Sequence, residues 1–331
     1  MSIRISFVVP VRNDAVRLET CLRSILAGAC GAAALDIVVV DNGSTDGSPD
    51  VARRMGAEVL VIENVRVSEL RNRGARHAAG DILAFVDADN EIAPGWVAAA
   101  VEMLQQPGVG AVGALYHAPS GGTWVQRTYG ALRGRTEGQR DTSWLGSGNL
   151  AVWRRTFEAV GGFDVSLEAC EDVDLCRRIR GTGARIVGDA RLVSAHHGDP
   201  RTLRDLFVSE LWRGRGNLRV SFRRPIVWAE LPSALIPVVD AAMLAVAAVG
   251  LAALAVAWPS GLLPVGVALL VIAAGALLKA ARAAARGTDA VGISLAQVFV
   301  VACVYDVARA FAVVWRAPHR NTRPRTAAAA S

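Results

Sequence analysis

The stretch ILAFVDADN, residues 82–90, decides which fold the chain can adopt. Its first five residues are apolar, as in a strand that is buried on both faces, and the run stops at two carboxylates, Asp87 and Asp89. In an open α/β sheet, ligands bind outside the carboxyl ends of the strands. Two acids with one residue between them can reach the same divalent cation, and oxygen ligands suit Mg²⁺ or Mn²⁺. Asp and Asn are also common where any strand turns, so the neighbouring sequence has to decide.

Strands and helices alternate along the first half of the chain. Apolar runs predict strands at 3–10, 36–41, 59–62, 82–87, 110–116 and 150–153, and helical spacing predicts helices at 16–26, 49–55, 69–79 and 96–104. This alternation is typical of a mostly parallel sheet with helices on its faces, so we expect an α/β fold.

A second acid, Asp41, ends the predicted strand 36–41 and precedes the turn-forming loop 42–48, NGSTDGS. The loop carries no dinucleotide-binding or P-loop pattern, and Asn-Gly and Asp-Gly are turn signals in their own right. Two parallel strands with acidic carboxyl ends nevertheless form one acidic crevice. Such a crevice can hold a metal-bound nucleotide, with Asp41 accepting a hydrogen bond from the base or the ribose.

Four segments in this order resemble the inverting family 2 glycosyltransferases of GT-A fold. They are PVRND at 10–14, VVDNGSTDGS at 39–48, ELRNRGARHAAGDILAFVDAD at 69–89 and GGFDVSLEACEDVDLCRRIRGTG at 161–183. The resemblance implies donor-binding roles for Pro10, Arg12, Asp41, Arg71 and Asp87, and places the metal bound to the diphosphate on Asp87 and Asp89. It implies a GT-A fold, and Mg²⁺ or Mn²⁺ as the cofactor.

The acids Glu171 and Asp172 form a second acidic cluster, which begins another predicted helix. Acids are favourable at any helix N-terminus, which is the simplest explanation. Inverting sugar transfer, however, needs one carboxylate that takes the proton of the acceptor hydroxyl. The resemblance assigns this role to Asp172, with Glu171 beside it orienting the acceptor or a loop.

Two adjacent histidines, His196 and His197, follow strand-like sequence, and a histidine in this region completes the metal site of many GT-A enzymes. The pair leaves the register open; we favour His197 as the third ligand, against both merely covering the edge of the site. Residues 117–143 lack periodicity, and we expect a mobile loop on the acceptor side or a plain surface excursion. We place Trp144 and Trp212 near the acceptor.

The C-terminal third is strongly apolar, and no charged residue occurs from 241 to 278. We expect a transmembrane hairpin formed by 241–258 and 261–278. The segment 293–315 contains Asp306 and Arg309, so we favour an interfacial helix, or one packed on the hairpin with these charges paired, over a full third span. The basic segment 201–224 predicts an amphipathic helix at the membrane surface.

These patterns predict a catalytic domain at 1–200, an interfacial segment at 201–230, membrane-associated helices at 231–316 and a disordered tail at 317–331. Basic residues flank the hairpin on both sides, which favours cytoplasmic positions for both ends of the hairpin.

The net charge of the whole chain is +6, and its positive charges are almost all arginine. We attribute this to coding bias and expect no nucleic-acid partner. The five cysteines show no metal-binding or paired spacing, which fits a reduced compartment. The first apolar run is short and strand-like, so we expect no cleavable signal peptide.

The sequence therefore predicts a glycosyltransferase of the bacterial inner membrane whose catalytic domain faces the cytoplasm. Its expected partners are a nucleoside-diphosphate sugar, the membrane and a lipid-linked glycan acceptor of cell-surface polysaccharide or glycolipid synthesis. A polyprenyl-phosphate sugar synthase is the alternative within the same class. A nucleotidyltransferase and an inert sugar-nucleotide-binding scaffold are more remote alternatives. The segment 209–217 loosely resembles the (Q/R)xxRW segment of processive members, but Ser209 or Glu210 stands where Gln or Arg is expected.

Overall fold

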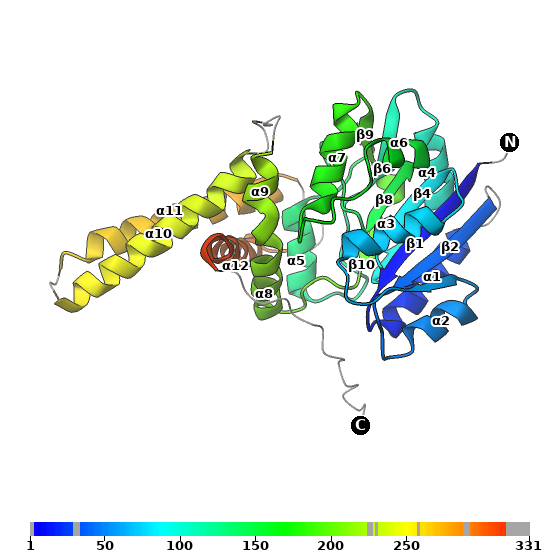
Figure 1. Cartoon of the computed structure of the whole chain (residues 1–331). Coiled ribbons are helices and arrows are strands. Elements are labelled where there is room, and N and C mark those ends of the chain that lie inside the picture. Colours follow the sequence, from blue (N-terminus) through cyan, green and yellow to red (C-terminus); the bar gives the residue numbers. More distant parts are fainter. Residues whose placement is uncertain are drawn as a thin grey trace. The chain divides into compact units, whose positions relative to one another are not determined.

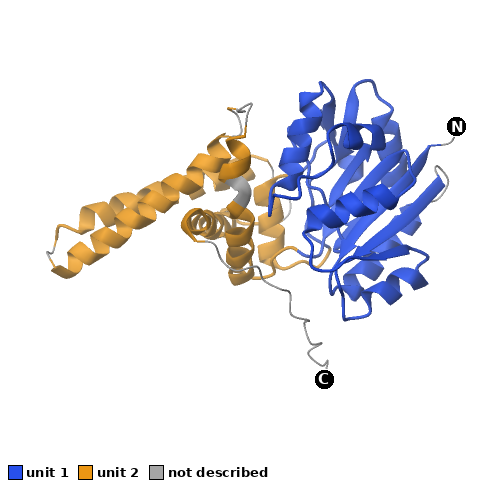
Figure 2. Cartoon of the chain, in the orientation of Figure 1, with its two compact units in different colours: residues 1–119, 135–198, 320–331 blue, residues 120–134, 199–319 orange. Residues whose placement is uncertain are grey.

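The computed structural model describes residues 3–28, 34–223, 228, 231–256, 259–286 and 292–315. Its residues form two compact units, coloured separately in Figure 2. The described residues of the α/β unit lie within 1–119 and 135–198, and those of the helical unit within 120–134 and 199–319. The predicted tail from 317 and Cys30 lie outside the described residues.

The α/β unit is built on one mixed, mostly parallel sheet (Figure 1). Its strands are β1 (Arg4–Val11), β2 (Ala34–Asp41), β3 (Glu58–Val61), β4 (Ile82–Val86), β6 (Val109–Gly113), β7 (Gln139–Asp141), β8 (Asn149–Trp153) and β9 (Arg185–Asp189), in the order β3-β2-β1-β4-β8-β6-β9-β7. Strands β1 to β4 are parallel, and β8 is antiparallel to both β4 and β6. A small second sheet pairs β5 (Asn90–Ile92) with β10 (Ser194–His196). The predicted α/β class is confirmed.

Helices lie along the sheet because each presents one apolar stripe to it. They are α1 (Ala15–Gly28), α2 (Ser48–Arg54), α3 (Val67–His77), α4 (Trp96–Leu104), α6 (Arg154–Ala159) and α7 (Glu171–Gly181), with a 3₁₀ turn at Ala190–Leu192. One apolar core contains Phe7 and Trp96, whose rings lie 5.6 Å apart. A second contains Phe85, Phe157 and Phe163. Alternate residues of the central strands therefore enter two different cores.

The topology brings the acidic strand ends to one edge of the sheet. Val11 at the end of β1 pairs with Asp41 at the end of β2, and β4 lies on the other side of β1. Adjacent strands are about 4.8 Å apart, so Asp41 and Asp87 are separated by roughly 10 Å. Because β8 reverses direction between β4 and β6, β6 also ends at this edge, and Tyr116 follows it three residues later.

The helical unit consists of α5 (Trp124–Arg133), α8 (Leu203–Arg213), α9 (Asn217–Ser221), α10 (Leu231–Val256), α11 (Leu262–Ala284) and α12 (Leu295–Val314), with a 3₁₀ turn at Gly214–Gly216. By length and composition, α10, α11 and α12 could each cross a membrane. Helix α10 begins ten residues before the predicted span 241–258 and contains Asp240. Helix α11 continues past the predicted end at 278 and contains Lys279.

Residues 120–134 overturn the prediction that 117–143 is a loop without regular structure. Thr123 and Gln126 form a capping box that begins α5: the Thr123 hydroxyl accepts from the Gln126 N–H, and the Gln126 side chain accepts from the Thr123 N–H. Val125 and Tyr129 then pack against Leu206 of α8 and Val301 of α12. The segment is thus a structural part of the helical unit.

A buried ionic network ties α5, α8 and α12 together. The fully buried Glu210 carboxylate accepts from the Tyr129 hydroxyl at 2.6 Å and from Arg309 Nε at 2.7 Å. Arg213 Nη1 donates to Tyr129 Oη at 2.8 Å and to Glu210 at 3.2 Å. The carboxylate is therefore paired on both oxygens, as a buried charge requires.

The second charged group of α12 pairs separately. Asp306 accepts from Lys279 Nζ of α11 at 2.6 and 2.8 Å through its two oxygens. Asp306 and Arg309, expected to be paired within the protein, thus each have a partner on a different helix. These contacts hold α12 to both α8 and α11.

Candidate active site

The expected donor pocket contains polar atoms that no protein group satisfies. Asp41 is 1% exposed; its Oδ2 accepts from the Ser44 N–H at 2.8 Å, while Oδ1 has no hydrogen-bond partner among the described residues. Pro10 is buried in β1. Arg12 follows it, and its buried Nε is likewise unpartnered within the described part of the chain. Buried polar groups are normally hydrogen-bonded, so these atoms mark a place for a ligand.

Arg71 of α3 joins two acids that lie far apart in the sequence. Its guanidinium is 3% exposed and contacts Asp87 Oδ1 at 2.5 Å and Glu171 Oε1 at 2.9 Å. Burial alone would lower the pKa of Arg71, but the two carboxylates raise it, so the guanidinium stays charged. Glu171 also accepts from the Ser147 hydroxyl at 3.4 Å. Arg71 is thus occupied by protein acids, and its predicted contact with the nucleotide stays a prediction.

Asp89 lies between an imidazole and a guanidinium. Asp89 Oδ1 faces His196 Nε2 at 3.4 Å, and Oδ2 lies 3.8 Å from Arg17 Nη1. Asp14 holds Arg17 through Nε at 2.8 Å and Nη2 at 2.6 Å. Burial would raise the pKa of Asp89, but His196 and then Arg17 more than offset it, so the pKa is lowered. Asp89 is therefore ionised at neutral pH.

Strand β10 determines which histidine reaches the acid. His196 is the register partner of Asn90, the residue after Asp89. His197 is turned away, and its Nε2 lies 2.9 Å from Glu91 Oε2. Alternate residues of a strand point to opposite sides, so only one of the two can face Asp89. The structure brings His196, and not the favoured His197, to the carboxylate.

The residues present fit part of a divalent-metal site. A carboxylate and an imidazole that face each other suit Mn²⁺. A Cβ built on Gly198 would lie 1.8 Å from Asp89 Oδ2, so the backbone after the histidines closes tightly over this carboxylate. Among the residues that the structure describes, no three His, Cys, Asp or Glu side chains converge as a metal site. Asp87 is engaged by Arg71, so its ligand role stays a prediction.

The expected general base lies at the N-terminus of α7. Cys170 precedes this helix in the left-handed conformation, at φ 63°, and turns the chain into it. Asp172 Oδ1 accepts from the Val173 N–H at 2.8 Å. Burial, followed by the negative charge of Glu171, raises the pKa of Asp172 to about 7. A carboxylate with such a pKa is well matched to proton transfer near neutral pH.

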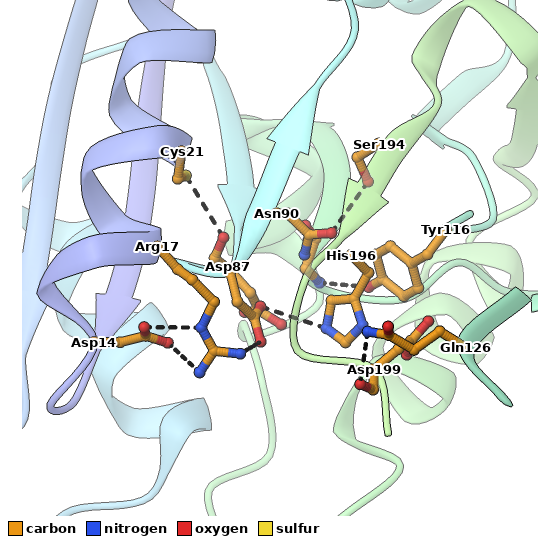
Figure 3. Close-up of polar contacts among 12 residues, drawn as sticks. Asp14, Arg17, Cys21, Asp87, Asn90, Tyr116, Gln126, Ser194, His196 and Asp199 are labelled. Carbon is orange, nitrogen blue, oxygen red and sulfur yellow. Dashed lines mark hydrogen bonds and ion pairs between the residues drawn. The ribbon is translucent and has the colours of Figure 1, made fainter. Parts of the chain in front are cut away.

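Two residues at this site were not singled out from the sequence, Tyr116 and Arg17. The ring of Tyr116 stacks on His196 with centroids 5.1 Å apart (Figure 3). Its position just after β6 is a usable signal, because that strand ends at the acidic edge. Trp144 is 40% exposed in the α/β unit, and Trp212 is half-buried on α8 of the helical unit. Their acceptor roles stay predictions.

A mostly parallel α/β sheet with this acidic edge defines the GT-A class of sugar-transferring enzymes. Among solved structures, the mannosyltransferase PcManGT from Pyrobaculum calidifontis, in complex with GDP-Man and Mn²⁺, matches with a TM-score of 0.61 at 22% identity. The match covers 95% of this chain and 88% of that one, and shows the shared fold.

Sequence comparisons match the first half of the chain to a family. The glycosyl transferase family 2 model matches residues 6–155. The glycosyltransferase AglE of Haloferax volcanii is 27% identical over 226 residues, which are 65% of this chain and 73% of that protein. The pre-mycofactocin glycosyltransferase of Mycobacterium tuberculosis is 28% identical over 235 residues, 67% of this chain but 48% of that protein. The protein is a glycosyltransferase, and its residues 6–155 match family 2.

Proposed function

We propose that the protein transfers a sugar, with inversion, from a nucleoside-diphosphate sugar to a lipid-linked glycan. The observation that carries this proposal is the acidic edge of the sheet. There a buried Asp41 with a free Oδ1, the Asp89–His196 pair and Asp172 belong to one α/β unit. Donor recognition, metal binding and proton acceptance each have a suitable group in this arrangement.

The donor is bound through its nucleoside by Asp41. The free Oδ1 accepts a hydrogen bond from a base N–H or a ribose hydroxyl, and the free Nε–H of Arg12 donates to an oxygen of the donor. PcManGT was solved with GDP-Man and Mn²⁺, so GDP-sugars belong in the set of donors to test together with UDP- and dTDP-sugars. Asp89 and His196 would hold the metal, since a facing carboxylate and imidazole suit Mn²⁺.

Sugar transfer proceeds in a single displacement. When bound, Mn²⁺ or Mg²⁺ neutralises charge on the diphosphate leaving group. Asp172 takes the proton of the acceptor hydroxyl as this oxygen attacks the anomeric carbon from the side opposite the diphosphate. Arg71 holds Asp87 and Glu171 in place through its two ion pairs. Attack from the opposite side inverts the configuration at that carbon.

Membrane attachment uses the hairpin α10–α11, with α12 along the surface. Of the most apolar 18 residues, 11% are buried in α10 and in α11 but 39% in α12. Within the helical unit, Figure 1 shows α10 and α11 lengthwise but α12 down its axis. The paired charges Asp306 and Arg309 also favour a helix against protein over one surrounded by lipid. Basic residues at 201–224 and 279–286 favour cytoplasmic positions for both hairpin ends.

The test is release of nucleoside diphosphate by the full-length protein in lipid nanodiscs. UDP-, GDP- and dTDP-sugars are offered with Mn²⁺ or Mg²⁺, together with either a membrane lipid extract or a pure polyprenyl phosphate. We expect metal-dependent release from one donor, lost in Asp89→Asn and kept in Asp50→Asn, an exposed acid paired with Arg53.

Each other outcome points to a different protein. Activity with the polyprenyl phosphate alone would identify a polyprenyl-phosphate sugar synthase. Release of pyrophosphate from a nucleoside triphosphate and a sugar phosphate would identify a nucleotidyltransferase. Absence of both products, without thermal stabilisation by any donor, would identify a scaffold and refute the proposal.

A further inference from the structure

The side chain of Tyr116 touches both halves of the proposed active site. Its ring lies on the His196 imidazole, with centroids 5.1 Å apart and planes inclined by 30°. At its other end the hydroxyl accepts from the Gly148 N–H at 3.0 Å. A stacked ring restricts the rotation of an imidazole, so Tyr116 bears directly on the group that faces Asp89.

The loop before β8 is shaped around this side chain. A Cβ built on Gly146 would lie 2.4 Å from the Tyr116 hydroxyl, and one built on Gly148 would lie 2.4 Å from Asp87 Oδ2. Neither approach leaves room for a side chain, which explains glycine at both positions. The Gly148 carbonyl in turn accepts from the Asp87 N–H at 3.2 Å and from Asn90 Nδ2 at 3.1 Å. The hydroxyl is therefore fixed to the loop that is hydrogen-bonded to Asp87.

We propose that Tyr116 is a positioning residue for the transfer reaction: its ring fixes His196 against Asp89, and its hydroxyl fixes the Gly148 loop that is bonded to Asp87. This inference rests on the proposed function. It predicts that the two parts of one side chain control two separable properties. The ring controls metal affinity, and the hydroxyl controls the catalytic step.

Two substitutions separate these parts. Tyr116→Phe keeps the ring and removes the hydroxyl; we expect kcat to fall about tenfold, the effect of losing the hydrogen bond to Gly148, with Mn²⁺ affinity within twofold of wild type. Tyr116→Leu removes the ring and should additionally weaken Mn²⁺ binding, by about tenfold.

Mn²⁺ binding is measured without any donor, from the electron paramagnetic resonance of the free ion, so this readout does not depend on turnover. Tyr129→Phe is the matched control, since it removes a phenol hydroxyl bonded to Glu210 in the helical unit. The control should keep wild-type kcat, pH profile and Mn²⁺ affinity even if it lowers the melting temperature.

The proposal is overturned if Tyr116→Phe and Tyr116→Leu both behave as wild type. It is also overturned if both variants lose kcat and Mn²⁺ affinity in parallel with their melting temperatures, which would show a merely structural role. In either case an active, metal-dependent wild type would leave the proposed function standing. A wild type that binds no Mn²⁺ and releases no nucleoside diphosphate would refute the two proposals together.

Discussion

The carboxylate of Asp172 combines a helix N-terminus, which holds it rigidly, with burial, which makes it a stronger base. Replacing it with the isosteric amide removes the proton acceptor and little else. We expect Asp172→Asn to lower kcat by about 10³-fold, within the usual contribution of a general base. Donor binding, measured as thermal stabilisation by the sugar nucleotide, should be retained. More than a tenth of wild-type activity at saturating donor would rule out the assignment.

The pH dependence of turnover should report the same group. The pKa of Asp172 is raised to about 7 by burial and then by Glu171. Only the ionised form accepts a proton, so kcat should rise with pH and level off above about 7. Glu171→Gln removes the neighbouring negative charge and should move this rise to lower pH. A profile that is flat between pH 5 and 9, or that falls with pH, would contradict this role.

Gly198 offers a test of the Asp89 position that leaves every charged group in place. Because a Cβ here would lie 1.8 Å from Asp89 Oδ2, Gly198→Ala must displace the carboxylate or the backbone. We expect Mn²⁺ affinity to fall at least tenfold, measured by titration of the full-length protein. Gly181→Ala is the control, because no atom lies within 4 Å of its added Cβ. Equal affinities in the two variants would show that the carboxylate tolerates displacement.

The sequence could predict the acids of the site but not all of their neighbours. Asp41, Asp87 and Asp89 follow recognisable strands, so their common edge follows from topology. The choice between His196 and His197 depends on the pairing of β10 with β5, which brings together residues about a hundred positions apart. Tyr116 follows a strand whose direction is known only once β8 is placed between β6 and β4.

The junction between α3 and β4 depends on a single arginine at the start of α6. Arg154 donates to the carbonyl oxygens of Ala75 at 2.8 Å, Ala78 at 2.7 Å and Gly80 at 2.7 Å. Carbonyls at a helix C-terminus have no partner within the helix, and cations there are favourable. One side chain thus satisfies three backbone groups.

Removing these bonds should destabilise the α/β unit. We expect Arg154→Met to lower the free energy of unfolding by about 3 kcal/mol, as for charged hydrogen bonds that leave buried carbonyls unpaired. The measurement is urea denaturation of the full-length protein in detergent, followed by circular dichroism. Arg155→Met is the control: this exposed neighbour stacks on Trp153 and should cost less than 1 kcal/mol. Similar losses in both variants would refute the role of Arg154.

Strands and helices were predictable from the sequence where their apolar residues follow a regular pattern. The strands β1, β2, β3, β4 and β8 lie within two residues of the predicted ranges, because each contains a short, largely apolar run. Helix α5 was missed because its buried face includes Gln126 and Thr128, which hide the period. The Thr123–Gln126 capping box was the available signal. Its partners lie on α8 and α12, which no local pattern reveals.

The proposed topology of the whole chain places the hairpin tip outside the cell and the end of α12 inside. Ser260→Cys lies at the tip and Trp315→Cys at the end of α12. In intact bacterial cells, we expect a membrane-impermeant maleimide to label the first but not the second. Both should react after permeabilisation.

The protein without an added cysteine gives the background labelling of the native cysteines. Val16→Cys, on the surface of the α/β unit, reports a cytoplasmic position. Labelling of Trp315→Cys in intact cells would show that α12 crosses the membrane as a third span. Labelling of Val16→Cys but not of Ser260→Cys would show that the whole protein has the opposite orientation.

Helix α5 determines how this protein can be truncated to its α/β unit. The chain leaves the α/β unit at about residue 120, contributes one helix to the helical unit, and returns at about residue 135. Truncation near residue 200 would remove Leu206 and Val301 and expose the faces of Val125 and Tyr129 that pack on them. A soluble enzyme fragment should therefore replace 120–134 with a short polar linker as well as end near residue 198. A chimaera that takes its membrane anchor from a relative would have to exchange residues 120–134 and the helices after residue 198 together.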